Sequence, residues 1–138
     1  MAMRKNAKIE LIKRVPLFSQ CSKTELARVA AIADEIHMPE GRTLTVEGQP
    51  GREFFVLVDG NVDVRTGKKK INELSSGDFF GEVSVLAGTP RTATVTATAP
   101  VRLLVVTDRD LQRLLKDSPG IQAKVLQALA QRLAPDTI

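Results

Sequence analysis

The chain has 138 residues, of which 43% are hydrophobic and 26% charged, and its formal net charge at pH 7 is +4. This length and composition predict a single folded domain over residues 1–138 and exclude an intrinsically disordered chain. No segment predicts a membrane span, and residues 1–5 do not begin a signal peptide, so we expect a cytoplasmic protein without membrane contacts.

The nucleophilic and metal-binding side chains give little support for catalysis. The single cysteine, Cys21, excludes an internal disulfide and is expected only to pack. His37 has no further ligands near it in the sequence, so neither a zinc centre nor a cupin-like metal site is predicted. Ser84 and Ser118 lack a recognisable general base. We therefore predict a protein that is not an enzyme and has no cofactor.

The positive charge is not arranged as expected for nucleic-acid binding. Lys68, Lys69 and Lys70 follow Gly67 between two strand-like runs, which indicates the solvated tip of a hairpin. The aromatic fraction is 4%, without Trp or Tyr, so few side chains could stack on bases. No nucleic-acid partner is predicted for this chain alone.

The predicted elements begin with a helical segment over residues 1–34. A short helix over 8–13 is broken at Pro16. Ser22 and Glu25 have the spacing of a capping box, which predicts the start of a second helix. An apolar stripe at helical spacing supports that helix, which should end near Asp34; it comprises Leu26, Val29, Ala30 and Ala33.

Residues 35–107 change to period-two alternation with closely spaced glycines, which predicts short antiparallel strands joined by tight turns. The candidate strands are 43–46, 54–58, 62–65, 71–74, 93–97 and 103–106, with a hairpin turn at 59–61. Such strands close into a roll to protect their edges. The predicted fold is therefore mainly β with flanking α-helices: an antiparallel β-roll, or jelly roll.

Two C-terminal helices are predicted over residues 108–138. Asp108 is the expected N-cap of a helix over 109–116, and Ser118 with Pro119 begins the last helix. The apolar face expected for that last helix comprises Ile121, Val125, Leu126, Leu129 and Leu133. This face is expected to pack into the core.

The segment 79–93, FFGEVSVLAGTPRTA, carries a carboxylate and a guanidinium at the two ends of a glycine-bounded loop. Gly81 allows close backbone approach to a ligand, and a short helix over 82–86 would direct free amide groups toward an anion. Arg91 can bind phosphate oxygens in pairs, whereas Glu82 beside a phosphate needs a donor such as a ribose hydroxyl. A surface ion pair bracing the loop is the alternative interpretation.

This segment resembles the phosphate-binding cassette of cyclic nucleotide-binding domains, which occur in bacterial cAMP-responsive regulators, protein kinase regulatory subunits and gated channels. The glycine-punctuated strands around 47–60 extend the resemblance over nearly the whole chain. It implies that Glu82 binds the ribose 2′-hydroxyl and Arg91 the cyclic phosphate, and that backbone amides near Gly81, Ser84 and Ala93 assist. The expected ligand-binding set is Gly81, Glu82, Val83, Ser84, Arg91, Thr92 and Ala93.

The purine is expected to lie against apolar strand residues, for which Val64, Ile71 and Leu74 are candidates, although all three could equally be core. Thr92 occupies a position where some family members use a hydroxyl, so the resemblance implies cAMP as ligand and allows cGMP. A short last helix leaves open what covers the purine.

The preferred hypothesis is a cyclic nucleotide receptor module that signals by moving its C-terminal helices against a downstream protein or a second copy of itself. The alternative is the sensory fragment of a cAMP-dependent transcription regulator, because residues 132–138 leave no room for a DNA-binding helix-turn-helix. Hydrolysis of the bound nucleotide is a third hypothesis, for which no metal cluster or positioned base is visible.

Overall fold

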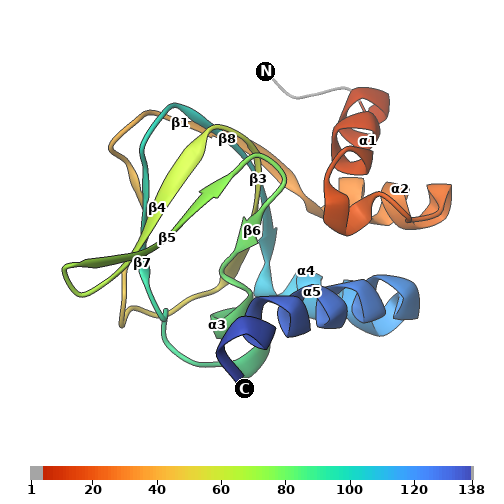
Figure 1. The fold of residues 1–138 in the computed structure, drawn as a ribbon. Helices are drawn as coiled ribbons and strands as arrows, with labels where there is room; N and C mark the ends of the chain where they lie inside the picture. The colour runs from red at the N-terminus through yellow and green to blue at the C-terminus, as the bar shows by residue number, and fades with distance from the viewer. Residues whose placement is uncertain (1–4, 138) are drawn as a thin grey trace.

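The computed structural model describes residues 5–137, with side chains described for residues 7–131. Helices from both ends of the chain pack beside a roll of strands (Figure 1). The helices are α1 (Lys5–Lys13), the 3-10 turn η1 (Pro16–Phe18), α2 (Lys23–Ile32), α3 (Glu82–Ala87), α4 (Asp108–Asp117) and α5 (Pro119–Thr137). The strands are β1 (Asp34–Met38), β2 (Thr43–Thr45), β3 (Glu53–Asp59), β4 (Asn61–Thr66), β5 (Lys69–Ser75), β6 (Phe79–Phe80), β7 (Thr94–Ala97) and β8 (Val101–Thr107).

The strands form two antiparallel sheets that face each other. One sheet has the order β1-β8-β3-β6 and the other β2-β7-β4-β5, so strands far apart in the sequence become neighbours. This confirms the predicted β-roll with flanking helices, and each of the six predicted strands is present within a residue or two of its expected bounds.

Strand β3 is apolar at successive positions because both of its faces are covered. Phe54 and Val56 belong to a core cluster shared with the helices, whereas Phe55 and Leu57 belong to the cluster inside the roll. The same alternation holds in β8, where Leu104 faces the helices. Among the described residues, the helices therefore share their core with the sheet β1-β8-β3-β6 and not with the sheet β2-β7-β4-β5.

Three predicted boundaries differ from the structure. Helix α1 begins at Lys5 instead of residue 8, and α2 ends at Ile32, because Asp34 already pairs with Val105 as the first residue of β1. Thr107, not Asp108, caps α4, since its hydroxyl accepts a hydrogen bond from the amide of Asp110.

The last helix also differs in its apolar face. Ile121 and Val125 are buried as expected, and Leu129 packs against the same core. Leu126 is instead 61% exposed, since it is the next residue after Val125 and turns away from the core. The side chain of Leu133 lies outside the described residues.

The lysine run lies at the end of the β4–β5 hairpin, and only Lys68 lies in the turn. Lys69 and Lys70 are the first residues of β5, where they pair with Thr66 and Arg65, and their side chains are exposed.

Among the residues 5–137, no helix combines the length and apolarity needed to cross a bilayer.

Candidate functional site

A cavity of about 350 Å³ lies where the sheet β2-β7-β4-β5 meets the segment from β6 to β7. Its wall contains the whole ligand-binding set predicted from the sequence. It is lined by Thr45, Val64, Asn72, Leu74, Phe80, Gly81, Glu82, Val83, Ser84, Arg91, Thr92, Ala93, Val95 and Gln131. The residues of the loop expected to bind a ribose phosphate therefore line one common cavity.

Arg91 is held in the wall of this cavity and is only 7% exposed. Its Nη1 donates to the carbonyl of Gly81 at 3.1 Å and its Nη2 to the carbonyl of Glu53 at 2.8 Å. The guanidinium also lies 5.7 Å from the centre of the Phe55 ring. Two carbonyls and one ring thus fix the plane of the guanidinium in the cavity wall.

Burial lowers the pKa of Arg91, and the carboxylates of Glu53 and Glu82 act in the opposite direction. An arginine keeps its proton throughout the accessible pH range, so the group remains a cation in an environment of reduced dielectric. A cation held in this way attracts a phosphate more strongly than one exposed to water.

Glu82 is the first residue of α3 and is 5% exposed. Such burial excludes the interpretation of Glu82 and Arg91 as a surface ion pair. Gly81 precedes it with φ +88°, a conformation that residues with a side chain rarely adopt. A Cβ on Gly81 would lie 2.8 Å from both Arg91 Nη1 and the Glu53 carbonyl, so glycine is needed for space as well.

Two of the three residues proposed to contact the base line the cavity, and the third does not. Val64 and Leu74 lie in its wall, whereas Ile71 is 53% exposed and lies outside it. The reason is alternation along β5, because Asn72 and Leu74 line the cavity and Ile71 therefore points away from it. Ile71 is also the extra residue of a bulge, since Val64 pairs with Asn72 and Arg65 with Lys70. Ile71 then shares the outer face of the sheet with Glu73.

Sequence reasoning missed the polar side chains of the cavity floor. Thr45 is 6% exposed, and its hydroxyl donates to the carbonyl of Ala93 at 3.0 Å. Asn72 lies on β5 among the residues first assigned to an apolar wall. Each sits at an inward position of its strand, a signal that alternation alone could have given once the register was known.

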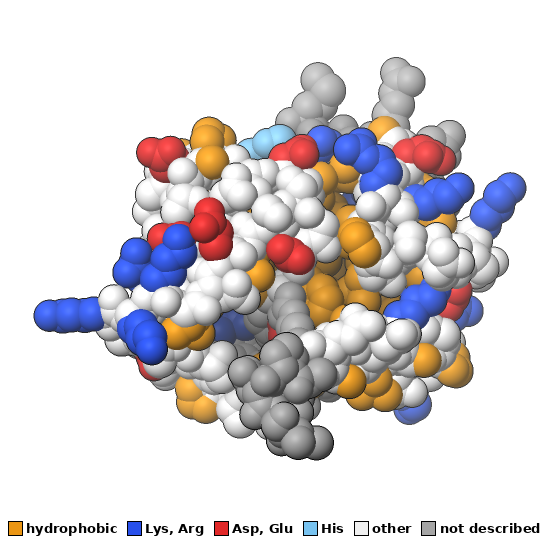
Figure 2. All heavy atoms as spheres, in the orientation of Figure 1, with side chains coloured by type: hydrophobic (Ala, Val, Ile, Leu, Met, Phe, Trp, Pro, Cys, Tyr) orange, Lys and Arg blue, Asp and Glu red, His pale blue; other side chains and the backbone are white. Residues whose placement is uncertain are grey.

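The last helix reaches the same cavity through Gln131. Gln131 also lines a neighbouring cavity of about 600 Å³ between η1, the β5–β6 turn and α5, with Leu17 and Phe79 in its wall. Figure 2 shows hydrophobic side chains within the hollow between the roll and the helices. Helix α5 therefore forms a wall shared by both spaces.

The side chains set aside by sequence reasoning lie elsewhere. His37 is 69% exposed and its Nε2 lies 2.6 Å from Oε1 of Glu35, and the described residues contain no cluster able to hold a metal ion. Cys21 packs near Lys124 of α5, and the Ser118 hydroxyl accepts a hydrogen bond from Arg28. The contacts of Cys21 and Arg28 join the N-terminal helical segment to the C-terminal helices.

Comparison with known proteins identifies relatives that, by their descriptions, bind or depend on cyclic nucleotides. The sequence model described as "Cyclic nucleotide-binding domain" matches residues 35–118, more than half of the chain. A putative potassium channel protein of Rhodopseudomonas palustris is 31% identical over 125 residues, covering 88% of this chain and 30% of that protein. A cAMP-dependent protein kinase regulatory subunit of Mycosarcoma maydis is 34% identical over 116 residues, covering 78% of this chain and 22% of the subunit.

The chain spans between 22% and 34% of the length of five curated relatives that it matches. Among solved structures, the second cyclic nucleotide-binding domain of a protein kinase A regulatory subunit, with bound Sp-2Cl-cAMPS, superposes with a TM-score of 0.78 at 24% identity. That match covers 96% of this chain and 94% of the solved one, which establishes the fold. The residues 35–118 that the sequence model matches include every residue lining the cavity except Gln131. The chain belongs to the cyclic nucleotide-binding domain family.

Proposed function

We propose that this chain is a receptor module that binds cAMP, with cGMP as a second ligand, in the cavity beside α3. The observation that carries the proposal is that one loop contributes a buried guanidinium, Arg91, and a buried carboxylate, Glu82, to the wall of one cavity. A phosphate accounts for the first group and a ribose hydroxyl for the second. Membership of the family and the cAMP-dependent relative point to the same ligand class.

In this proposal Arg91 binds the cyclic phosphate and Glu82 accepts a hydrogen bond from the ribose 2′-hydroxyl. Gly81, Val83, Ser84, Thr92 and Ala93 complete the contact surface, which all of them line. The hydroxyl of Thr92 is compatible with either purine. The protein acts by binding, without turnover of the nucleotide and without a metal or cofactor.

The signal is proposed to leave through α5, because Gln131 of this helix lies in the cavity wall. A ligand that contacts one arrangement of α5 better than another shifts the population of the two arrangements by that difference in affinity. The output is then a changed contact of the C-terminal helices with another protein or with a second copy of the chain.

Isothermal titration calorimetry with cAMP and cGMP tests the binding. We expect both nucleotides to bind the native protein and Arg91→Ala to lower the affinity at least about tenfold, as expected for loss of a charge-assisted contact. Arg91→Lys keeps the charge without the paired donors and should fall between the two. Arg113→Ala, an exposed arginine of α4, is the matched control and should bind as the native protein does.

Failure of the folded native protein to bind either nucleotide at micromolar concentration would refute the proposal. Binding retained in Arg91→Ala would refute the phosphate contact, and circular dichroism of each variant confirms that its fold is intact. Chromatography of cAMP after incubation with the protein checks the absence of turnover, since accumulating AMP would identify an enzyme.

A further inference from the structure

Helices α4 and α5 meet at one residue, Ser118. Helix α4 ends at Asp117 and α5 begins at Pro119. Ser118 lies between them with φ −131° and ψ 84°, outside the helical region, and is 3% exposed. Its amide donates to the carbonyl of Leu114 in α4, and its carbonyl accepts from the amide of Gln122 in α5. Because so short a joint has few free dihedral angles, the contacts around Ser118 decide the direction of α5.

Arg28 of α2 binds this joint at the end of α4. Its Nη1 donates to the carbonyl of Asp117 at 3.1 Å and to the hydroxyl oxygen of Ser118 at 3.3 Å. The last carbonyls of a helix have no partner inside the helix and carry the negative end of its dipole. A guanidinium at this position therefore stabilises the end of α4 and bonds to the joint as well.

Glu25 lies one turn before Arg28 on α2 and beside the start of α5. A Cβ on Gly120, the second residue of α5, would lie 3.0 Å from Oε2 of Glu25, so the carboxylate lies directly against the helix backbone. The first turn of α5 contains no acidic residue of its own, although a negative charge is favourable there. Glycine weakens a helix, but at this position it leaves room for the carboxylate of a neighbouring helix.

Both charged side chains lie on one face of α2, because residues three apart in a helix are neighbours. The other carboxylate oxygen of Glu25, Oε1, accepts from the amide of Ser22 at 3.0 Å, which fixes the carboxylate. Helix α2 lies beside α4 (Figure 1), and Sγ of Cys21, just before α2, lies 3.8 Å from Nζ of Lys124 in α5. The α2 segment thus places a cation at the end of α4 and an anion at the start of α5.

The direction of α5 matters for the proposed nucleotide cavity because Gln131 of this helix lies in the cavity wall. Gln131 follows Ser118 by thirteen residues, which corresponds to about 20 Å of helix. A tilt of about 10° at the joint would then move Gln131 by roughly 3 Å. Small changes of angle at Ser118 therefore change this side of the cavity.

We propose that Glu25 and Arg28 are positioning residues for nucleotide binding: together they fix the angle between α4 and α5 and so hold Gln131 in the cavity wall. We call this pair the α2 clamp. A charge at a helix end favours the clamped arrangement about two- to fivefold, and the two charges together about tenfold. The fixing of α5 stands on the contacts alone, whereas its effect on affinity rests on the proposed binding of a cyclic nucleotide.

Amide hydrogen exchange of the full chain, measured by NMR, tests the α2 clamp. We expect Arg28→Ala and Glu25→Gln each to raise the exchange rates of the Gln122 and Val125 amides about two- to fivefold, and the double variant about tenfold, with no change in β3. Glu25→Gln removes the charge but keeps the capping box of α2, in which glutamine can replace glutamate. Arg28→Lys keeps the cation and should restore most of the native protection.

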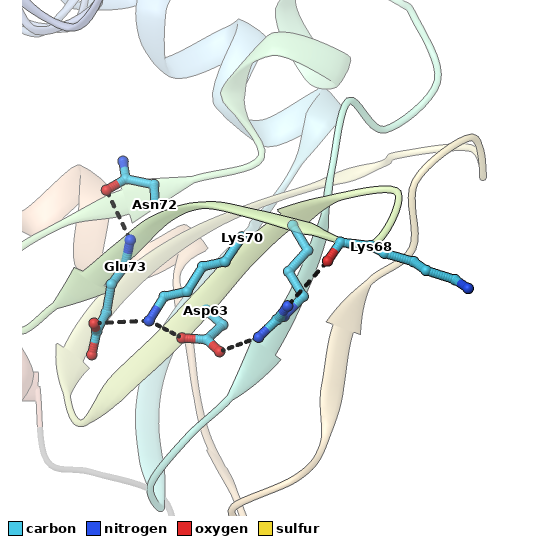
Figure 3. Close-up of polar contacts among 6 residues, drawn as sticks. Asp63, Lys68, Lys70, Asn72 and Glu73 are labelled. Carbon is cyan, nitrogen blue, oxygen red and sulfur yellow. Dashed lines mark hydrogen bonds and ion pairs between the residues drawn. The ribbon is translucent and has the colours of Figure 1, made fainter.

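The affinity for cAMP, measured by calorimetry, tests the link to the cavity. We expect the double variant to bind at least about twofold more weakly, because only the fraction of molecules with α5 in place presents Gln131 to the ligand. Lys70→Ala is the matched control, since Lys70 also makes two polar contacts, to Asp63 and Glu73 within the β4–β5 hairpin (Figure 3). It should change neither the exchange of α5 nor the affinity.

Native exchange rates in α5 of the double variant would overturn the α2 clamp. An equal rise at every slow amide, including those of β3, would also overturn it, since the two residues would then stabilise the whole fold without positioning α5. Faster exchange in α5 at unchanged cAMP affinity would refute the link to Gln131. If the native protein binds no nucleotide, the proposed function fails, and the exchange rates still decide whether the clamp holds α5.

Discussion

A Cβ atom on Gly51 would lie 2.6 Å from Nε of Arg91, so the backbone of the β2–β3 loop lies directly against the guanidinium. Gly81 borders the same side chain, where a Cβ would lie 2.8 Å from Nη1. Arg91 is thus enclosed by two glycines from segments thirty residues apart in the chain. Its position depends on the absence of two side chains as much as on the hydrogen bonds that it makes.

Gly51→Ala should therefore weaken nucleotide binding without removing any charged group. The new methyl group forces the Arg91 side chain away from the carbonyls of Glu53 and Gly81. We expect about a tenfold loss of affinity, similar to the loss of one charge-assisted contact, as measured by calorimetry. Gln49→Ala in the same loop is the control, and an unchanged affinity for Gly51→Ala would contradict the requirement for space.

Glu82 can be tested with a ligand that lacks its proposed partner. The native protein should bind 2′-deoxy-cAMP about tenfold more weakly than cAMP, because a buried carboxylate loses a hydrogen bond. Glu82→Ala should bind both ligands with equal, reduced affinity, since the ribose hydroxyl then has no acceptor to lose. Glu40→Ala, an exposed residue of the β1–β2 turn, should keep the native preference. Discrimination that persists in Glu82→Ala would assign the hydroxyl to another residue.

Glu35 predicts a pH dependence of stability. Burial raises the pKa of its carboxyl, but hydrogen bonds from His37 and Arg102 outweigh this effect, and the pKa lies below its ordinary value. Because the folded-state pKa is lowered, the stabilisation is complete above the unfolded-state pKa and is lost as the pH falls through the folded-state pKa. Glu35→Gln should lower the free energy of unfolding by roughly 1 kcal/mol at pH 7.

Urea denaturation at pH 7 and at pH 3 measures this difference. The gap between the native protein and Glu35→Gln should shrink toward zero at the lower pH, where the native carboxyl is increasingly protonated. The exposed Glu40→Gln should leave stability unchanged at both values. A gap that is equally large at both pH values would assign the loss to packing.

Ser22 predicts a local contribution to stability at the start of α2. Its hydroxyl accepts from the amide of Glu25 at 3.1 Å, and the Glu25 carboxylate accepts from the amide of Ser22 at 3.0 Å. Ser22→Ala should lower the free energy of unfolding by about 1 kcal/mol. Lys23→Ala, one residue into the helix, is the control. If chemical denaturation finds the same free energy of unfolding for both variants, the Ser22 cap does not stabilise the protein.

The sequence predicted those elements that form from interactions between residues close together in the chain. The capping box at Ser22 and the apolar stripe of α2 needed no knowledge of the rest of the fold, and the cassette was recognisable from consecutive residues. Strand β1 was missed as an element because Asp34, Glu35 and His37 hide its alternation, and it forms by pairing with β8. The two-residue strand β6 likewise exists only because Phe55 and Val56 lie opposite it.

The cavity wall likewise contains residues that are consecutive in the chain and residues that only strand pairing brings together. Residues of the cassette were predictable because they follow one another along the chain. Ile71 was assigned to the wall together with Leu74, although residues three apart in a strand lie on opposite faces, and the structure places Asn72 and Leu74 in the wall instead. Thr45 could be placed only through its pairing with Val95, fifty residues later, which no local pattern encodes.

The floor of the cavity takes one residue from each of four strands whose order in space, β2-β7-β4-β5, differs from their order in the chain. A peptide spanning 79–93 would hold both charged groups yet lack Thr45, Val64, Asn72 and Val95. The cavity floor therefore exists only once the whole sheet has assembled. We expect the affinity for a nucleotide bound in this cavity to report how completely the roll has closed.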